Sequence, residues 1–255
     1  MISKTDIKKI RLLHQKKYRD ETKTFIAEGP KTVIDFIKSG MEPLALYGLP
    51  GFFERNEKIF SALSREKKIS VSETGLKKIS SLSAPSQVLG IFPVPEQDSY
   101  RKYISKVPFL VLENISDPGN MGTIIRIAGW FGFAVMASPG SVDFYNPKVV
   151  QASMGSAGRV KLFSAGLEDA LLEFKKKIPV FAATLDGKNI YREKLPPLCA
   201  VVIGNESRGV SGKILKHIPE KIHIPSFSMG VDSLNAAVCA GIICSEIRRK
   251  KFTGQ

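Results

Sequence analysis

The chain has 255 residues, of which 43% are hydrophobic, so it can bury a substantial core and is not a disordered protein. No apolar run approaches the roughly 20 residues that span a bilayer, and the N-terminus lacks the apolar core of a signal peptide, which predicts a cytoplasmic protein. Lysine and arginine number 38 against 24 acidic residues, a formal charge of +14. This excess favours a polyanionic partner, nucleic acid before anionic membrane, over a surface that is basic only for solubility.

The cysteines favour a structural role over a metal site. Cys199, Cys239 and Cys244 lie in apolar runs, and the chain has only three histidines. Metal-ligand spacing is therefore missing, and we expect buried, reduced thiols and no metal.

The N-terminal part carries clustered basic residues and short elements. Residues 8–20 predict a helix that turns its isoleucines and leucines to a core and leaves Lys16, Lys17 and Arg19 to solvent. A strand is expected over 24–29, followed by a helix over 30–40. Further short elements complete an α/β module, which we delimit as residues 1–97.

A linker and a second α/β domain are expected after this module. Residues 98–107 form the expected linker, because the region is rich in proline and polar residues and has no clean period. From 108 to 255, apolar runs alternate with helical patterns, beginning with a run at 109–115 that is typical of a strand buried on both faces. This alternation predicts a mainly parallel sheet with helices on both faces.

Three unusual loops follow strands of the second domain, where open parallel sheets bind their ligands. In the first, residues 117–120, Asp-Pro-Gly-Asn, predict a turn, and a helix follows in which Arg126 interrupts an apolar stretch. The loop is neither a G-x-G-x-x-G fingerprint nor a P-loop, which disfavours a dinucleotide site. Taken by itself, Arg126 fits a structural role, by snorkelling to the surface or pairing with a carboxylate, better than a functional one.

The other two loops place a carboxylate and an amide at the same edge of the sheet. Glu206 ends a buried strand in the sequence VVIGNESRGVS, where Gly209 permits a tight turn. Ser233 and Asn235 flank a leucine at the opening of the last helix, where capping by Asp232 or Ser233 and a surface position for Asn235 are the plain alternatives.

In order along the chain, the segments NMGTIIRIAG, VVIGNESRGVS and IPSFSMGVDSLNAAV resemble the three motifs of the SpoU (TrmH-type) RNA ribose 2′-O-methyltransferases of the SPOUT class. The resemblance covers residues 109–249. The N-terminal segment is similar to the L30e-like, RNA-binding domain that is often fused to these enzymes.

The resemblance implies a C-terminal trefoil knot, an obligate homodimer with its active site at the subunit interface, and a structured RNA, rRNA or tRNA, as substrate. The cofactor implied is S-adenosylmethionine, held against the backbone at Thr184, Gly204, Ile224, Leu234 and Met229. It also implies an active site of Arg126, Asn120, Glu206, Ser233 and Asn235. Lys16, Lys17 and Arg19 would capture RNA electrostatically.

One departure from the family pattern concerns the third motif. Ser226 replaces the usual hydrophobic residue after the proline, and the loop to Ser233 is one residue longer. Two alternatives to the ribose methyltransferase remain: a non-enzymatic RNA-binding protein, for which the basic domain would suffice, and a SPOUT enzyme that methylates a base nitrogen.

Overall fold

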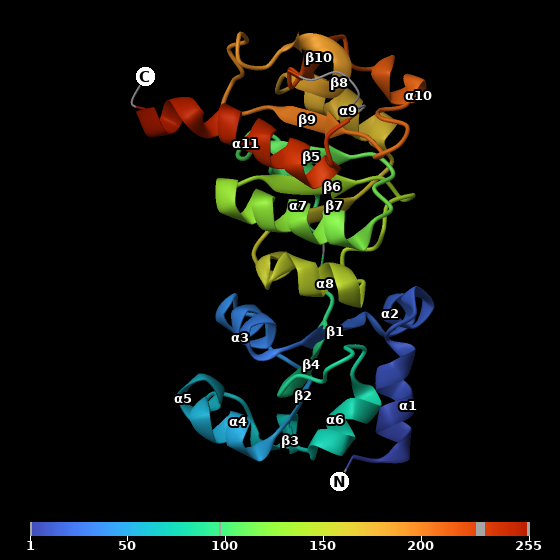
Figure 1. The fold of residues 1–255 in the computed structure, drawn as a ribbon, viewed down its shortest axis with the longest axis vertical. Coiled ribbons are helices and arrows are strands. Elements are labelled where there is room, and N and C mark those ends of the chain that lie inside the picture. The colour runs from blue at the N-terminus through green and yellow to red at the C-terminus, as the bar shows by residue number, and fades with distance from the viewer. Residues whose placement is uncertain (1, 97, 228–232, 254–255) are drawn as a thin grey trace. The chain divides into compact units, whose positions relative to one another are not determined.

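The computed structural model describes residues 2–96, 98–227 and 233–253, and the chain divides into two compact units (Figure 1). The first unit contains the chain up to residue 96 together with residues 143–159, and the second contains the rest. The domain limits at 97 and 107 stay a prediction. Residues 143–159 lie within the expected second domain but belong to the first unit.

The first unit is built on a mixed four-stranded sheet. Its strands are β1 (Thr24–Glu28), β2 (Ala45–Gly48), β3 (Lys68–Ser70) and β4 (Val88–Pro93), in the order β1-β4-β2-β3. β4 pairs antiparallel with both β1 and β2, whereas β2 and β3 are parallel. The helices of this unit are α1 (Lys4–Leu12), α2 (Lys16–Thr22), α3 (Pro30–Lys38), α4 (Pro50–Arg55), α5 (Glu57–Phe60), α6 (Glu73–Ile79) and α8 (Pro147–Ser153).

The basic N-terminal segment forms two helices instead of the single one expected, and this break changes the role of Arg19. The Arg19 side chain is buried, donates to the Leu13 carbonyl over 2.8 Å and lies 2.6 Å from the Asp143 carboxylate. The expectation that Arg19 faces solvent and captures RNA is therefore wrong. A buried guanidinium needs such partners, because water no longer solvates it.

The inserted segment 143–159 packs closely within the first unit. Besides the ion pair of Asp143, its Tyr145 ring lies 4.7 Å from the ring of Phe25 on β1. Asn146 caps α8 by accepting a hydrogen bond from the backbone N–H of Lys148, as its Asn-Pro opening predicts. The segment therefore contributes core residues to a unit that is otherwise N-terminal.

The second unit contains a six-stranded sheet in which every pairing is parallel, as the alternating pattern predicts. The strands are β5 (Phe109–Leu112), β6 (Ala134–Ala137), β7 (Leu162–Ser164), β8 (Val180–Asn189), β9 (Ala200–Ile203) and β10 (Glu220–His223). Their order is β10-β8-β9-β5-β6-β7, so the direction of winding changes between β5 and β9.

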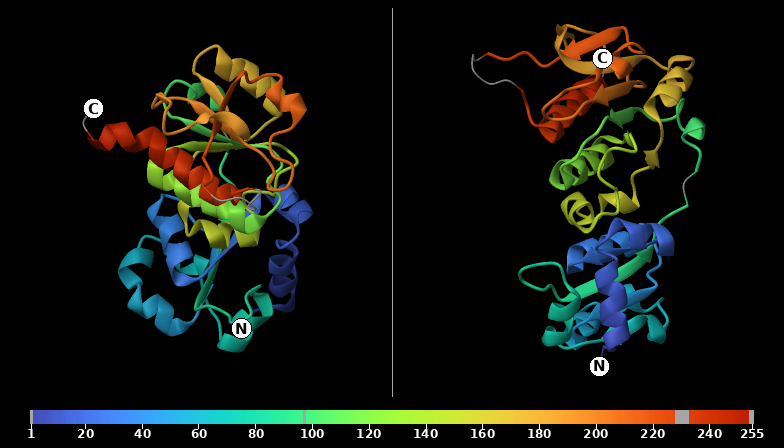
Figure 2. Two further views of the ribbon diagram at one scale, coloured as in Figure 1. Left: turned by 45° about the horizontal axis from the view of Figure 1, so that its top comes forward. Right: turned by 90° about the vertical axis from the view of Figure 1, so that its right-hand side faces the viewer.

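Helices cover both faces of this sheet. The long helices α7 (Pro118–Phe131) and α11 (Ala236–Thr253) pack side by side on one face, and α9 (Leu167–Lys175) lies on the other (Figure 2). The short α10 (Gly212–Leu215) joins the core on the α9 side. None of the described helices is long and apolar enough to cross a bilayer.

Helix α7 begins earlier than the sequence suggested. Asp117 caps it by accepting a hydrogen bond from the Asn120 backbone N–H over 2.7 Å, and Pro118 takes the first helical position. The expected turn over residues 117–120 is therefore the cap and first turn of the helix, because proline suits that position. The trefoil knot stays a prediction, since the loop before α11 includes residues outside the described part of the chain.

Candidate active site at the carboxyl ends of β5 and β9

The winding direction changes between β5 and β9, and polar side chains from the loops after these strands meet there. Parallel sheets of this kind bind ligands at such a switch point. Asn120 stands in the first turn of α7, which follows β5, and Glu206 stands in the loop after β9. The Asn120 Nδ2 donates to Glu206 Oε1 over 2.8 Å. Two of the three motif loops are therefore joined by a direct hydrogen bond.

Asn235 extends this contact to the third loop. Its Nδ2 donates to Asn120 Oδ1 over 2.8 Å, and its Oδ1 accepts from the backbone N–H of Ala237 over 2.9 Å. Asn235 therefore caps α11, as one of the alternatives had it, and also orients the Asn120 side chain. Each amide donates through its nitrogen and accepts through its oxygen, so both amide orientations are set by their partners. The hydrogen-bonded chain Asn235–Asn120–Glu206 therefore holds the carboxylate in a defined position.

The loop that carries Glu206 is held tightly from two sides. A Cβ on Gly204 would lie 2.0 Å from the Gly209 carbonyl carbon, so only glycine fits there, and Gly209 itself has a φ of +65°. Buried Glu113, at the end of β5, accepts hydrogen bonds from the backbone N–H and the hydroxyl of Ser211. These contacts fix the loop between Gly204 and Ser211 before any ligand binds.

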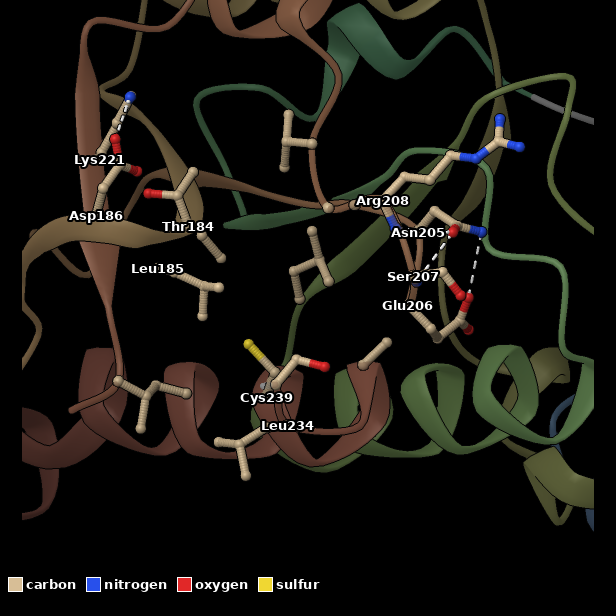
Figure 3. A pocket seen from close by; sticks show the side chains of 18 of the residues that line it. Thr184, Leu185, Asp186, Asn205, Glu206, Ser207, Arg208, Lys221, Leu234 and Cys239 are labelled. Carbon is tan, nitrogen blue, oxygen red and sulfur yellow. Dashed lines mark hydrogen bonds and ion pairs between the residues drawn. The ribbon is translucent and has the colours of Figure 1, made fainter. Parts of the chain in front are cut away.

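A pocket of about 580 Å³ opens beside this loop, a size typical of small-molecule sites (Figure 3). Its lining combines apolar side chains with a polar rim, and among the expected cofactor and site residues it includes Thr184, Gly204, Glu206, Ile224, Ser233 and Leu234. Met229 lies outside the described residues.

The pocket fits S-adenosylmethionine in size and chemistry. The Thr184 hydroxyl is buried beside Asp186 and makes no hydrogen bond of normal geometry with a described residue, so it can serve a ligand. Gly204 and Gly209 both line the pocket, and their close backbone contact, which a side chain on Gly204 would prevent, shapes this part of its lining. The apolar side chains of the lining would suit the adenine, and its polar side chains would suit the ribose and the amino-acid end.

Two features of the lining were not predicted from the sequence. Lys221 Nζ lies 2.7 Å from Asp186 Oδ2, and this hydrogen bond holds the pKa of Asp186 below its usual value. The Cys239 thiol also lines the pocket, and burial raises its pKa to about 11, so it stays protonated at neutral pH. Neither feature has a local sequence signal, because each depends on neighbours from other elements.

Arg126 is brought to the surface instead of into the pocket. It is exposed on α7, and no described side chain forms a hydrogen bond or an ion pair with its guanidinium. Trp130, one turn further along, is 85% exposed. Leu234, just before the neighbouring α11, is 45% exposed, and Val238, on α11, is 50% exposed. The structural ion pair considered for Arg126 does not form within the described part of the chain.

Comparisons with known proteins identify the family. Residues 108–245 match the model of the SpoU rRNA methylase family, and residues 4–90 match that of the MRM3-like substrate binding domain. The chain is 27% identical over 251 residues to the 23S rRNA (guanosine(2553)-2′-O)-methyltransferase RlmP of Bacillus subtilis, covering 95% of each protein.

Solved structures agree over the whole length. A Porphyromonas gingivalis protein described as an RNA methyltransferase of the TrmH family has 34% sequence identity and a TM-score of 0.85, with 98% of this chain and 99% of that chain covered. The AdoMet-bound rRNA methyltransferase of Sinorhizobium meliloti has 29% identity and a TM-score of 0.85, with 98% and 97% covered. The chain belongs to the SpoU rRNA methylase family and is an S-adenosylmethionine-dependent RNA ribose 2′-O-methyltransferase.

Proposed function

We propose that this enzyme methylates a ribose 2′-hydroxyl of ribosomal RNA in the cytoplasm, and that the Asn235–Asn120–Glu206 chain holds the acceptor nucleotide. The observation that carries this proposal is the hydrogen-bonded chain itself, which joins three loops at the mouth of the pocket. The relative from B. subtilis, named for a 23S rRNA guanosine, supports rRNA over tRNA.

Residues of the site have two tasks in this proposal, which are to position the ribose hydroxyl and to stabilise the charge that develops on it. When bound, S-adenosylmethionine would supply an activated methyl group, with its thioether as the leaving group, so the protein has to place the ribose hydroxyl and remove its proton. A guanidinium is a donor of hydrogen bonds and not a proton acceptor, so Arg126 is not assigned the role of base. It binds the phosphate beside the target ribose and stabilises the developing alkoxide, and that phosphate or a water molecule takes the proton.

The exposure of Arg126 supports a further proposal, a homodimer in which each active site contains residues of both protomers. Its helix α7 and the adjacent α11 present Trp130, Leu234 and Val238 to solvent, an apolar face of the kind that a second copy covers. In such a dimer, Arg126 of one protomer serves the pocket of the other. Lys16 and Lys17, which are exposed on α2, support capture of RNA by the N-terminal unit.

The substrate is tested with purified enzyme, labelled S-adenosylmethionine and total RNA from cells that lack the gene. We expect label in rRNA and a 2′-O-methylated nucleoside after digestion, mapped to a single position. Label only in tRNA, or on a base nitrogen, would contradict the proposal, and cofactor binding without any transfer would favour a plain RNA-binding protein.

Mixed dimers test whether the site is shared. Arg126→Ala and Glu206→Ala are each expected to be inactive, but unfolding and refolding them together produces mixed dimers with one intact site. Random assortment then restores about a quarter of wild-type activity, because half of the dimers are mixed and each has one working site. Activity that stays absent after mixing, in dimers that still form, would place Arg126 and Glu206 in the same protomer.

A further inference from the structure

Two cations line the pocket among the described residues, and they differ in what binds them. Lys221 is paired with Asp186 across 2.7 Å. Arg208 is exposed, and no described side chain accepts a hydrogen bond from its guanidinium or forms an ion pair with it. A guanidinium left without a carboxylate at the mouth of an active site is available to a ligand.

Arg208 does not pair with the nearest acid, Glu206, because that carboxylate is already engaged. Glu206 accepts from Asn120 over 2.8 Å and from the Asn205 amide over 3.4 Å. Figure 3 shows the Arg208 side chain running away from Glu206 and from the side of the pocket on which Thr184, Leu234 and Cys239 lie. The charge therefore points outward, past the cofactor pocket.

Two hydrogen bonds hold the backbone of the turn that carries Arg208. The Asn205 side-chain oxygen accepts from the Arg208 backbone N–H over 3.3 Å, and the Gly209 N–H donates to the Asn205 carbonyl over 2.8 Å. The turn that carries Arg208 thus starts at the residue before Glu206. The backbone hydrogen bonds thus hold the base of the Arg208 side chain two residues from Glu206, and the exposed guanidinium can reach a ligand near the acceptor site.

We propose that Arg208 binds an RNA backbone phosphate flanking the target nucleotide, and so positions the rRNA strand on the loop that carries Glu206. This inference rests on the proposed function and adds a substrate contact that the three motifs do not assign. The planar guanidinium suits two oxygens of a phosphate. The carboxylate of S-adenosylmethionine is the other anion at hand, but the outward direction of the side chain favours RNA.

The test compares Arg208→Ala and Arg208→Lys with Arg192→Ala, a matched control. Arg192 is also exposed, does not line the pocket, and its side chain bonds to no described residue. The RNA probe is a fluorescent rRNA transcript that carries the mapped methylation site. Affinity for S-adenosylmethionine is measured by calorimetry, and affinity for the transcript is measured between 50 and 200 mM salt.

We expect Arg208→Ala to bind the transcript about tenfold more weakly at low salt, and to flatten the slope of log affinity against log salt by about 0.7–0.9, the loss of one phosphate contact. Arg208→Lys keeps the slope and recovers part of the affinity, because the charge stays and the paired donors are lost. Cofactor affinity stays within about twofold, and the KM for RNA rises more than kcat falls. Arg192→Ala matches the wild type.

Two results would overturn this inference without touching the proposed function. Weaker cofactor binding with an unchanged salt slope would assign Arg208 to the cofactor carboxylate. An unchanged KM and slope in Arg208→Ala, in an enzyme that still transfers methyl groups, would leave Arg208 without a ligand. Failure of the proposed function itself looks different, because the wild type would then transfer no methyl group to rRNA.

Discussion

The two units differ in whether a prominent arginine is buried or exposed. In the N-terminal unit, Arg19 lies in a strongly basic run and is nevertheless buried, bonded to Asp143 and to the Leu13 carbonyl. In the second unit, Arg126 lies in an apolar run and is nevertheless exposed, with no partner among the described residues. The first arginine is part of the core contacts of its unit and the second stays open to solvent, so local composition is a poor guide to where an arginine lies.

Replacing Arg126 with alanine is expected to have the largest effect on activity. The variant should lose about 10²–10³-fold in methyl transfer, the cost of removing a donor that stabilises developing charge. Its thermal unfolding and its cofactor affinity should stay close to wild type, because the side chain is exposed. Transfer rates and calorimetric cofactor titration separate these effects, and near-normal transfer would refute the assigned role.

Replacing Arg19 with alanine is expected to act on stability instead. Breaking a buried ion pair strands the remaining charge, which costs about 3–5 kcal/mol of unfolding free energy. Lys17→Ala is the matched control from the same basic helix, since that side chain is exposed and its change should stay within about 0.5 kcal/mol. Denaturant unfolding measures both, and a loss below about 1 kcal/mol for Arg19→Ala would show that the pair does not hold the unit together.

A smaller loss of stability is expected from changing either of two buried glutamates, Glu28 and Glu113, which both accept hydrogen bonds from serines. Glu28, at the end of β1, accepts from the hydroxyls of Ser80 and Ser81, as Glu113 does from Ser211. Glutamine at either position should cost about 1–3 kcal/mol, because its amide NH2 replaces an accepting oxygen and so places a donor against the serine donors.

The two glutamine variants should differ in kinetics. Glu113→Gln should lower kcat, since the loop it holds carries Glu206. Glu28→Gln should raise the KM for RNA and leave kcat unchanged, since its loop lies in the substrate-binding unit. If both variants changed kcat and KM in the same way, the assignment of catalysis to one unit and RNA binding to the other would be contradicted.

The sheet could be predicted from the sequence because each buried strand has its own apolar run, and neighbouring carboxyl ends follow from the parallel pairing. The loops of Asn120, Glu206 and Asn235 could therefore be placed at one edge. The partner of Arg19 could not be predicted, because Asp143 stands 124 residues away. The unpaired state of Arg208 likewise depends on which groups Glu206 already binds, and no local pattern records that.

Residues 143–159 make the first unit discontinuous in the sequence. They depart after β6 and return before β7, yet they supply Asp143 and Tyr145 to the N-terminal unit. A fragment starting at residue 98 would keep these two side chains without Arg19 and Phe25, and would expose a charge and an aromatic ring that are half-covered or buried in the whole protein. The two units are thus interleaved along the chain, and a cut at residue 97 would separate Asp143 and Tyr145 from their partners in the N-terminal unit.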